Sequence, residues 1–321
     1  MPRALDIQIN GIVPIIPTPF TADDQADWTS HRNLIDFACA ADACAVCLPA
    51  YASEFYKLSE DERQRAVTEA VGQMRGRIPV IAQVNYPSAA QAVREARAAQ
   101  KSGASAIAVA VPRMFNLPES DLHRYFDKIL SAIDIPLLIQ DFSPSGPTVS
   151  PGFVASLNRA HPHFRWLKLE EPMMATKVVA VLQATSGAVG VLEGWGGMYI
   201  LDLIPAGICG VMPSLSLVDL LARIFRLAKA GDMHAADEIY QVVLPQIVFS
   251  LQHMELYHHA EKRLLEARGV LARVDVRDLR LELDRFQTGR IAFLNGQILA
   301  LLDRLKMPRN PVPAAAISGS K

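Results

Sequence analysis

The sequence predicts an α/β protein built as a (β/α)8 barrel, or TIM barrel, with a C-terminal all-helical extension. Short, almost wholly apolar runs recur along the chain, as expected of strands buried on both faces of a parallel sheet. The starts of these runs are roughly 20 to 35 residues apart, which leaves room for one helix and two loops each time. We place the strands at Gly11–Pro17, Cys44–Pro49, Val80–Asn85, Ile107–Pro112, Leu137–Asp141, Arg165–Glu170, Val189–Gly194 and Gly210–Pro213.

Start signals for helices fall between these strands. Ser59 and Glu62 form a capping box, Ser88 precedes an alanine-rich run, and Ser150 precedes a proline at the first helical position. After the fourth strand, helical spacing joins the apolar residues Leu122, Tyr125, Phe126, Ile129 and Leu130. A doubly wound open sheet is the alternative, but no early strand is followed by a G-x-G-x-x-G turn.

Beyond Gly231 the pattern is helical only. We expect one long helix over Ala235–His259, bent at Pro245, and a second over Ala260–Arg268 that ends at Gly269. A third helix carries the apolar stripe Leu279, Leu283, Phe286, Ile291, Leu294, Ile298 and Leu301. The expected organisation is therefore a barrel over 1–230, a helical extension over 231–310 and a disordered tail over 311–321, which is rich in Pro, Ala, Ser and Gly.

Charge and composition restrict the possible partners. The chain has 32 basic and 33 acidic residues, so no basic surplus is available for a nucleic-acid backbone. No signal peptide is evident and no apolar run reaches the ~18 residues of a membrane span, so we expect a cytoplasmic protein with no membrane partner. Cys44 and Cys47 have the spacing of a metal or redox pair, but they lie in an apolar run that reads better as a buried strand.

Lys168 is the residue on which the functional prediction depends. It lies between Leu167 and Leu169 in a strand that breaks at Pro172. Burying an ammonium is costly, so such a site favours the neutral amine, which can attack a carbonyl. The alternative is that the lysine extends to the surface or pairs with Glu170 or Glu171.

Polar residues at the ends of the other strands should meet Lys168 at the same rim, because active sites of such barrels lie at the carboxyl ends of the strands. A catalytic role is open for Glu170, Asp141 and Glu193, each of which also has a structural explanation, while Glu54 is expected to be structural. The eight histidines show no metal-binding spacing, so we predict no metal and no cofactor, and we expect His253 and His258 to be solvent-exposed. A nucleophile, carboxylates, hydroxyls and an amide on one rim indicate a pocket for a small polar substrate.

The order of these features resembles the dihydrodipicolinate synthase / N-acetylneuraminate lyase family of class I aldolases over about residues 8 to 305. The resemblance rests on order and spacing across all eight strands, so it is more specific than any single motif. The matching landmarks are Gly11-Ile12-Val13-Pro14, Thr18-Pro19-Phe20, Glu54, Leu58–Arg63, Ile78–Ala82, Gly103-Ala104, Ile135–Leu137, Leu167-Lys168, Glu170, Gly194 and Gly207–Val211. The resemblance implies a barrel with a helical extension, often a homotetramer, and an imine between Lys168 and a pyruvate-like 2-oxoacid.

The chain departs from the family pattern at several site positions. The Gly-Thr-Thr-Gly-Glu turn that holds the 2-oxoacid carboxylate stands here as Ala50-Tyr51-Ala52-Ser53-Glu54. Gln140 replaces the tyrosine that relays protons, and glutamine is not a useful proton donor. The tyrosine pair after strand four aligns with Arg113-Met114, and the arginine that meets a second carboxylate in the synthases aligns with Ser145. A replacement relay would come from Tyr51, Glu193 or a bound water, and Arg113 could supply the anion contact.

We therefore predict a Schiff-base lyase, of the aldolase or dehydratase type, that is not the synthase of lysine biosynthesis. The predicted catalytic residues are Lys168, Gln140 and Tyr51, and the predicted substrate-binding residues are Ala52, Ser53, Arg113, Glu193, Gly194, Trp195 and Met212. Trp195 suggests an aromatic or alicyclic substrate. Two alternatives remain: a barrel that has lost catalysis and binds a small molecule, and a dehydratase that uses carboxylates such as Glu170 and Glu193 without an imine.

Overall fold

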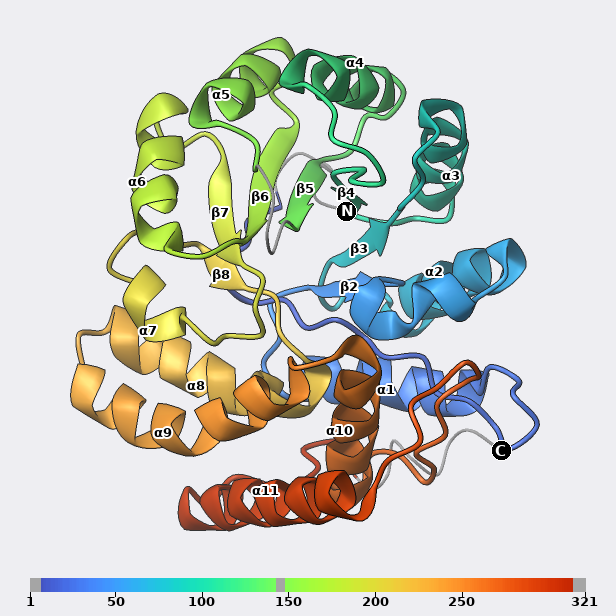
Figure 1. Cartoon of the computed structure of the whole chain (residues 1–321), viewed down its shortest axis with the longest axis vertical. Helices are drawn as coiled ribbons and strands as arrows, with labels where there is room; N and C mark the ends of the chain where they lie inside the picture. The colour runs from blue at the N-terminus through green and yellow to red at the C-terminus, as the bar shows by residue number, and fades with distance from the viewer. Residues whose placement is uncertain (1–6, 143–147, 314–321) are drawn as a thin grey trace.

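The computed structural model describes residues 7–142 and 148–313, and the eight expected strands form one parallel sheet within them. The strand order is β1-β8-β7-β6-β5-β4-β3-β2, the order of a (β/α)8 barrel laid open between its first two strands. Figure 1 shows the helices around the outside of these strands. The strands are β1 Gly11–Ile12, β2 Val46–Leu48, β3 Val80–Gln83, β4 Ala106–Ala110, β5 Leu137–Phe142, β6 Phe164–Glu170, β7 Gly190–Glu193 and β8 Gly210–Val211.

The barrel closes at Ile15, which bridges Cys47 of β2 on one side and Ser214 on the other. On the β2 side, Ile16 N donates to Cys47 O over 3.1 Å and Cys47 N donates to Pro14 O over 3.0 Å. Regular strand is shorter here than predicted, because β1 stops at Ile12 instead of Pro17 and β8 stops at Val211 instead of Pro213. Prolines have no N–H to donate, so the ladder around them is reduced to isolated bridges.

The serines predicted to begin helices are the N-caps of those helices in the structure. The Ser59 hydroxyl accepts from Glu62 N over 3.2 Å, and the Glu62 carboxylate accepts from Ser59 N over 2.9 Å. Ser88 and Ser150 cap α3 and α5 in the same position. The helices that follow the strands are α1 Trp28–Ala40, α2 Glu60–Met74, α3 Ala89–Lys101, α4 Glu119–Leu130, α5 Pro151–Ala160, α6 Met174–Ala184, α7 Ile200–Leu203 and α8 Val218–Lys229.

Two separate apolar clusters show which side chains point into the barrel. The larger cluster lies between strands and helices, and a smaller one, which includes Cys47, Ile81, Leu138 and Trp166, fills the barrel interior. Side chains two residues apart on a strand lie on the same face. Lys168 therefore follows Trp166 on the inside of the barrel. In the same way, Gln83 follows Ile81 and Gln140 follows Leu138. The register of β5 on β6 then sets Gln140 directly beside Lys168.

The helical segment after α8 breaks at a different place from the one predicted. Helix α9 covers Met233–Ser250 and α10 covers Met254–Ala267, so the expected unbroken helix over Ala235–His259 is wrong. Pro245 lies inside α9 without ending it. The boundary is set instead by His253, whose Nδ1 accepts from Glu255 N over 3.1 Å and caps α10. Histidine is not among the residues that usually signal an N-cap, so the sequence pattern did not reveal this start.

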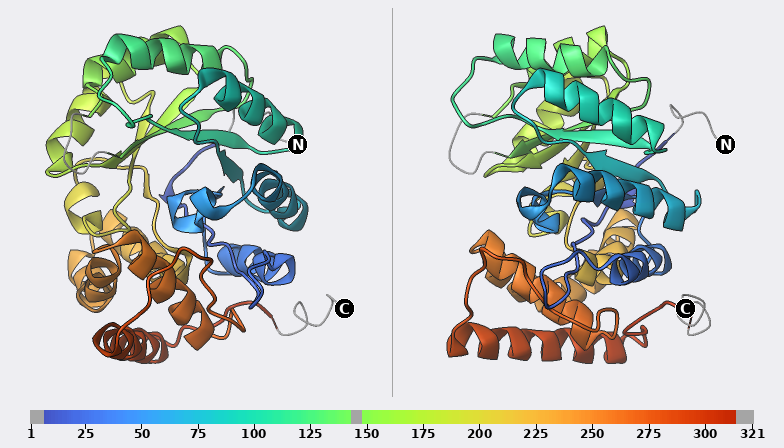
Figure 2. Two further views of the ribbon diagram at one scale, coloured as in Figure 1. Left: turned by 45° about the vertical axis from the view of Figure 1, so that its right-hand side comes forward. Right: turned by 90° about the vertical axis from the view of Figure 1, so that its right-hand side faces the viewer.

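The third extension helix, α11, covers Arg285–Arg304, packs against α9 and α10, and lies beside them in Figure 2. Its buried stripe is shorter than predicted, because Leu279 and Leu283 precede the helix and Phe286 is exposed. The apolar residues of the stripe that are buried are Ile291, Leu294, Ile298 and Leu301. The division into barrel and extension stays a prediction, and residues 314–321 of the expected tail lie outside the described part of the chain.

Candidate active site

A cavity of about 410 Å³ opens at the carboxyl ends of the strands and contains the predicted nucleophile. Lys168, Gln140, Tyr51, Ala52, Gly194, Trp195 and Met212 all line it, so seven of the ten predicted site residues meet there. Its lining also includes Ile15, Ala50, Phe142, Glu170, Gly196, Met198, Pro213, Leu251, Gln252, His253, Met254 and Tyr257. A concave, largely apolar cavity with few converging polar groups is typical of a small-molecule site.

A chain of hydrogen bonds along neighbouring strands positions the polar groups of this cavity. Lys168 Nζ lies 2.9 Å from Glu170 Oε1, and both side chains are more than nine-tenths buried. Gln140 Nε2 donates to the same carboxylate oxygen over 2.6 Å, and Gln140 Oε1 accepts from Gln83 Nε2 over 2.5 Å. Gln83 therefore holds Gln140, and Gln140 holds the Glu170 carboxylate beside the Lys168 amine. Gln140 orients this carboxylate and cannot itself relay a proton.

Gly194 makes room for the Lys168–Glu170 pair. A Cβ atom at position 194 would lie 2.3 Å from Glu170 Cγ and 2.7 Å from Lys168 Cε. Atoms at such distances overlap, so any side chain here would displace the pair. The close approach of the β7 backbone to the two side chains therefore requires glycine at this position.

The turn after β2 meets the cavity with Tyr51 and Ala52 but not with Ser53. The Ser53 hydroxyl donates to Ile16 O over 2.6 Å and accepts from Ala50 N over 2.9 Å, so it ties the turn to the strand before it. The amides of Tyr51 and Ala52 open the short 3₁₀ turn Tyr51–Ser53 and have no acceptor within it. Glu54 is buried and accepts from Lys262 Nζ over 2.6 Å, the structural role expected of it.

Arg113 and Asp141 pair with each other outside the cavity. The guanidinium of Arg113 donates to Asp141 Oδ1, while Asp141 Oδ2 accepts from Val149 N over 2.8 Å. Burial raises the pKa of the Asp141 carboxyl, and the neighbouring Arg113 guanidinium opposes that rise. Asp141 therefore joins Arg113, which follows β4, to Val149, which precedes α5, at the rim of the barrel. The aligned Ser145 lies outside the described residues.

Glu193, at the end of β7, is fully buried behind the cavity wall and does not line the cavity. Its Oε2 accepts from Gly197 N over 2.7 Å, while Oε1 has no hydrogen-bond partner within residues 7–142 and 148–313. Burial raises the pKa of this carboxyl to about 7. The protonated form is therefore favoured in the folded state, where charge would be costly.

Replacing Glu193 should change how stability depends on pH. A carboxyl whose pKa is raised on folding contributes most stability below its unfolded pKa, and this contribution is lost as pH rises from about 4.5 to about 7. Glu193→Gln mimics the protonated form at every pH. We expect it to match the wild type at pH 4.5 and to be more stable by about 3 kcal/mol at pH 8. Urea unfolding at pH 4.5 and pH 8 measures the free energy of unfolding of both proteins. Glu238→Gln, a change of an exposed glutamate, is the control. Equal stabilities of the wild type and Glu193→Gln at pH 8 would contradict the prediction.

Residues of the helical extension that sequence reasoning missed also line the cavity. Leu251, Gln252 and His253 form the break between α9 and α10, and Met254 and Tyr257 come from the first turn of α10. Only strand ends were considered when the site was predicted, and α10 was hidden inside one long expected helix. Phe142 and Met198 were missed because they follow a strand end by one residue or more and carry no charge.

The histidines are placed differently from the prediction. His258 is 1% exposed, so the expectation of solvent exposure is wrong for it, and burial holds its pKa well below the usual range. Within the described residues, no group of three or more His, Cys, Asp or Glu side chains is arranged to hold a metal ion. None of the helices in the described part of the chain is both long enough and apolar enough to span a membrane.

Comparison with known proteins agrees with this geometry. L-2-keto-3-deoxyarabonate dehydratase of Azospirillum brasilense is 27% identical over 266 residues, which cover 82% of this chain and 85% of the relative. The 4-hydroxy-tetrahydrodipicolinate synthase from Methylacidiphilum fumariolicum SolV superposes with a TM-score of 0.85 at 19% identity, over 93% of this chain and 99% of that one. YagE of Escherichia coli K12, solved in complex with pyruvate, superposes with a TM-score of 0.80 at 22% identity, over 93% and 99%.

At these identities the two solved structures establish the fold. The family itself follows from the model of the dihydrodipicolinate synthetase family, which matches residues 8–285, the greater part of the chain. That match contains all eight strands, Lys168 and the first turn of α10. The chain therefore belongs to the dihydrodipicolinate synthetase family and is an enzyme of the lyase type.

Proposed function

We propose that the protein is a Schiff-base lyase in which Lys168 forms an imine with a 2-oxoacid and Glu170 moves the protons. The observation that carries this proposal is the 2.9 Å contact between a buried lysine amine and a buried carboxylate at the floor of a substrate-sized cavity. YagE in complex with pyruvate supports a pyruvate-like substrate. The amides of Tyr51 and Ala52 are the groups we assign to the substrate carboxylate, because they begin a 3₁₀ turn that lines the cavity and have no acceptor within that turn.

The first stage is imine formation. Glu170 takes a proton from the Lys168 ammonium, and the neutral amine attacks the C2 carbonyl of the substrate. The carbonyl oxygen leaves as water with two of the three ammonium protons, so a protonated imine remains beside an ionised Glu170. This carboxylate then removes a proton from C3, and the electrons of the C–H bond move into the imine to give an enamine.

The enamine expels a group from C4, and we favour loss of a hydroxyl as water. The dehydratase of Azospirillum brasilense is a relative over most of its length, which supports this branch. Synthesis of a dicarboxylate precursor of lysine is not supported. In the described lining of the cavity Lys168 is the only lysine and no arginine is present, so a second carboxylate has no obvious cationic partner.

The apolar wall of the cavity indicates the substituent beyond C4. Phe142, Trp195, Met198, Met212, Leu251 and Met254 face the space that a substrate held at Lys168 would extend into. Hydroxyl groups of a sugar acid would lose water contacts against these side chains without gaining partners. We therefore propose a 4-hydroxy-2-oxoacid with an aromatic or alicyclic group, and we expect the protein to work as a homo-oligomer, as the resemblance implies.

Borohydride trapping tests this function. The wild type is incubated with pyruvate, 2-keto-3-deoxy-L-arabonate or 4-hydroxy-2-oxo-4-phenylbutanoate and reduced with borohydride. The mass of the protein is then measured by mass spectrometry. We expect a stable adduct with each acid. We also expect the phenyl compound to lose water faster than the sugar acid, and the absorbance of the conjugated product measures this rate. Thermal stabilisation by the acids without any adduct would instead favour a binding protein that has lost catalysis. Faster water loss from the sugar acid would contradict the proposed substituent.

A further inference from the structure

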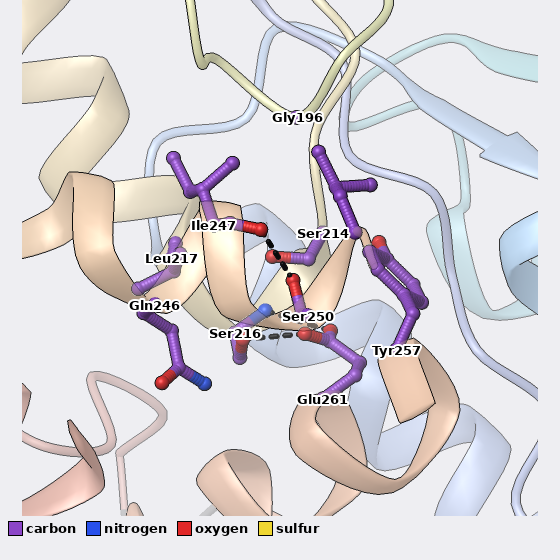
Figure 3. A pocket seen from close by; sticks show the side chains of 10 residues that line it. Gly196, Ser214, Ser216, Leu217, Gln246, Ile247, Ser250, Tyr257 and Glu261 are labelled. Atoms are coloured by element: carbon purple, nitrogen blue, oxygen red, sulfur yellow. Dashed lines mark hydrogen bonds between the residues drawn. The ribbon is translucent and has the colours of Figure 1, made fainter. Parts of the chain in front are cut away.

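A small polar cavity lies directly behind the wall of the active-site cavity. It measures about 10 Å³, enough for about one water molecule, and the two cavities share Gly196, Leu251 and Tyr257 as lining residues. Figure 3 shows Ser214, Ser216 and Ser250 gathered around it, with Tyr257 and Glu261 rising from α10. Three serine hydroxyls and a carboxyl therefore lie together behind a tyrosine that also lines the active-site cavity.

Glu261 is the buried acid of this cluster. Its Oε1 accepts from Ser216 N over 2.9 Å and its Oε2 accepts from the Ser216 hydroxyl over 2.5 Å. The side chain is 4% exposed and forms no salt bridge with any residue in the described ranges. Burial raises the pKa of this carboxyl, although the hydrogen bonds from Ser216 act in the opposite direction. A buried carboxyl without a cation is suited to hold a proton and to release it to a hydrogen-bonded neighbour.

Ser214 lines the small cavity together with Glu261 and Tyr257. A water that fills this space would lie among the three side chains. Tyr257 is buried, and burial raises its pKa well above the usual range, so its hydroxyl keeps a proton that it can donate. The small cavity therefore joins Glu261 and Ser214 to Tyr257, which alone of the three also lines the active-site cavity.

We propose that Tyr257 is the general acid of the reaction and that Ser214 and Glu261 resupply its proton. This inference rests on the proposed function and assigns the second of its two proton transfers. The phenol proton passes to the departing C4 oxygen as the C4–O bond breaks and the enamine electrons form the C3–C4 double bond, so the hydroxyl leaves as water. The phenol oxygen then takes a proton that Glu261 releases, carried across the small cavity by a water and the Ser214 hydroxyl. Glu170 meanwhile holds the proton from C3, and both carboxyls return to their starting states by exchange with solvent after the product leaves.

The position of Tyr257 separates the acid from the base. Glu170 lies on β6 at the floor of the cavity, whereas Tyr257 lies on α10, a helix outside the barrel strands. Tyr51 also lines the cavity, but its ring packs against Phe55 and Phe142, and no hydrogen bond joins its hydroxyl to another group in the described part of the chain. Tyr257 alone of the two also lines the small cavity that contains the buried acid Glu261.

Three measurements on Tyr257→Phe test the proposal, because they isolate successive steps. Borohydride trapping with pyruvate reports the imine. Exchange of the pyruvate methyl protons in D2O, followed by NMR, reports the enamine. Water loss from 4-hydroxy-2-oxo-4-phenylbutanoate and from 2-keto-3-deoxy-L-arabonate reports the acid step. We expect trapping and exchange within about threefold of the wild type, and water loss slower by roughly 10²-fold or more. Glu261→Gln and Ser214→Ala should show a smaller loss confined to the same step.

Tyr125→Phe is the matched control, because it removes one buried phenol hydroxyl that donates to Tyr86 O over 2.5 Å on the outer, helical layer. It should leave all three rates unchanged. Normal water loss by Tyr257→Phe would overturn the proposal, and so would an equal fall of all three rates, which indicates a structural role. A wild type that forms the imine yet loses water from neither probe also contradicts it. Absence of any imine on the wild type would instead refute the proposed function.

Discussion

Lys168→Ala should abolish both the borohydride adduct and the turnover of every 2-oxoacid. The amine is the only nucleophile in the described lining of the cavity that is placed to attack a carbonyl beside a buried carboxylate. Without it the imine cannot form, and each later step depends on the imine. We expect activity to fall by roughly 10⁴-fold or more, as is typical when a covalent nucleophile is removed.

Two further variants make this result interpretable. Lys168→Ala leaves the Glu170 carboxylate buried without its cation, which can destabilise the fold. Lys168→Arg keeps a positive charge beside Glu170 but offers no neutral amine, so it should fold and still give no adduct. Lys177→Ala removes a lysine that is also mostly buried but pairs with Glu171 over 2.9 Å outside the cavity, and it should keep the adduct. An adduct of normal mass on Lys168→Ala would place the nucleophile elsewhere.

Glu170→Gln should separate imine formation from proton transfer. Glutamine can still accept from Gln140 Nε2, which now donates over 2.6 Å to the carboxylate, but it cannot take a proton from C3. We expect the pyruvate adduct to form, more slowly than in the wild type, and exchange of the methyl protons in D2O to fall by roughly 10²- to 10⁴-fold. Glu171→Gln is the control, because this neighbouring carboxylate pairs with Lys177 and does not line the cavity. Exchange at the wild-type rate in Glu170→Gln would assign the base to another group.

The sequence identified the parts of the site that local chemistry determines. A charged residue in an apolar strand is rare enough to be informative, and two-residue alternation along β6 places Lys168 and Glu170 on one face whatever the rest of the fold does. The capping box, the other helix-start signals and the spacing of apolar runs likewise predicted the order of strands and helices that the structure shows.

Contacts between distant segments decided the rest. Arg113 and Ser53 have the right chemistry for an anion site, but Arg113 is held by Asp141 and Ser53 by Ile16, each more than 25 residues away in the chain. Glu193 ends a strand just as Glu170 does, yet the register of β7 on β6 sets it beside Leu169 and not beside Lys168, so it lies on the outer face of the barrel, away from the cavity. Side-chain partners of this kind depend on how separate elements pack, which no local pattern encodes.

The amino-acid sequence alone predicted the barrel, its helical extension and a lysine–glutamate pair on one strand, because periodicity and residue chemistry act over a few neighbouring positions. The tertiary structure alone decided that α10 starts at Met254 and brings Tyr257 to the active-site cavity, with Glu261 in the small cavity behind it. The start of that helix depends on a histidine cap, and its position depends on packing against the 3₁₀ turn Leu215–Leu217, more than 40 residues earlier in the chain, as the Ser216–Glu261 bonds show. Long-range packing therefore completes a site that the sequence only begins to define.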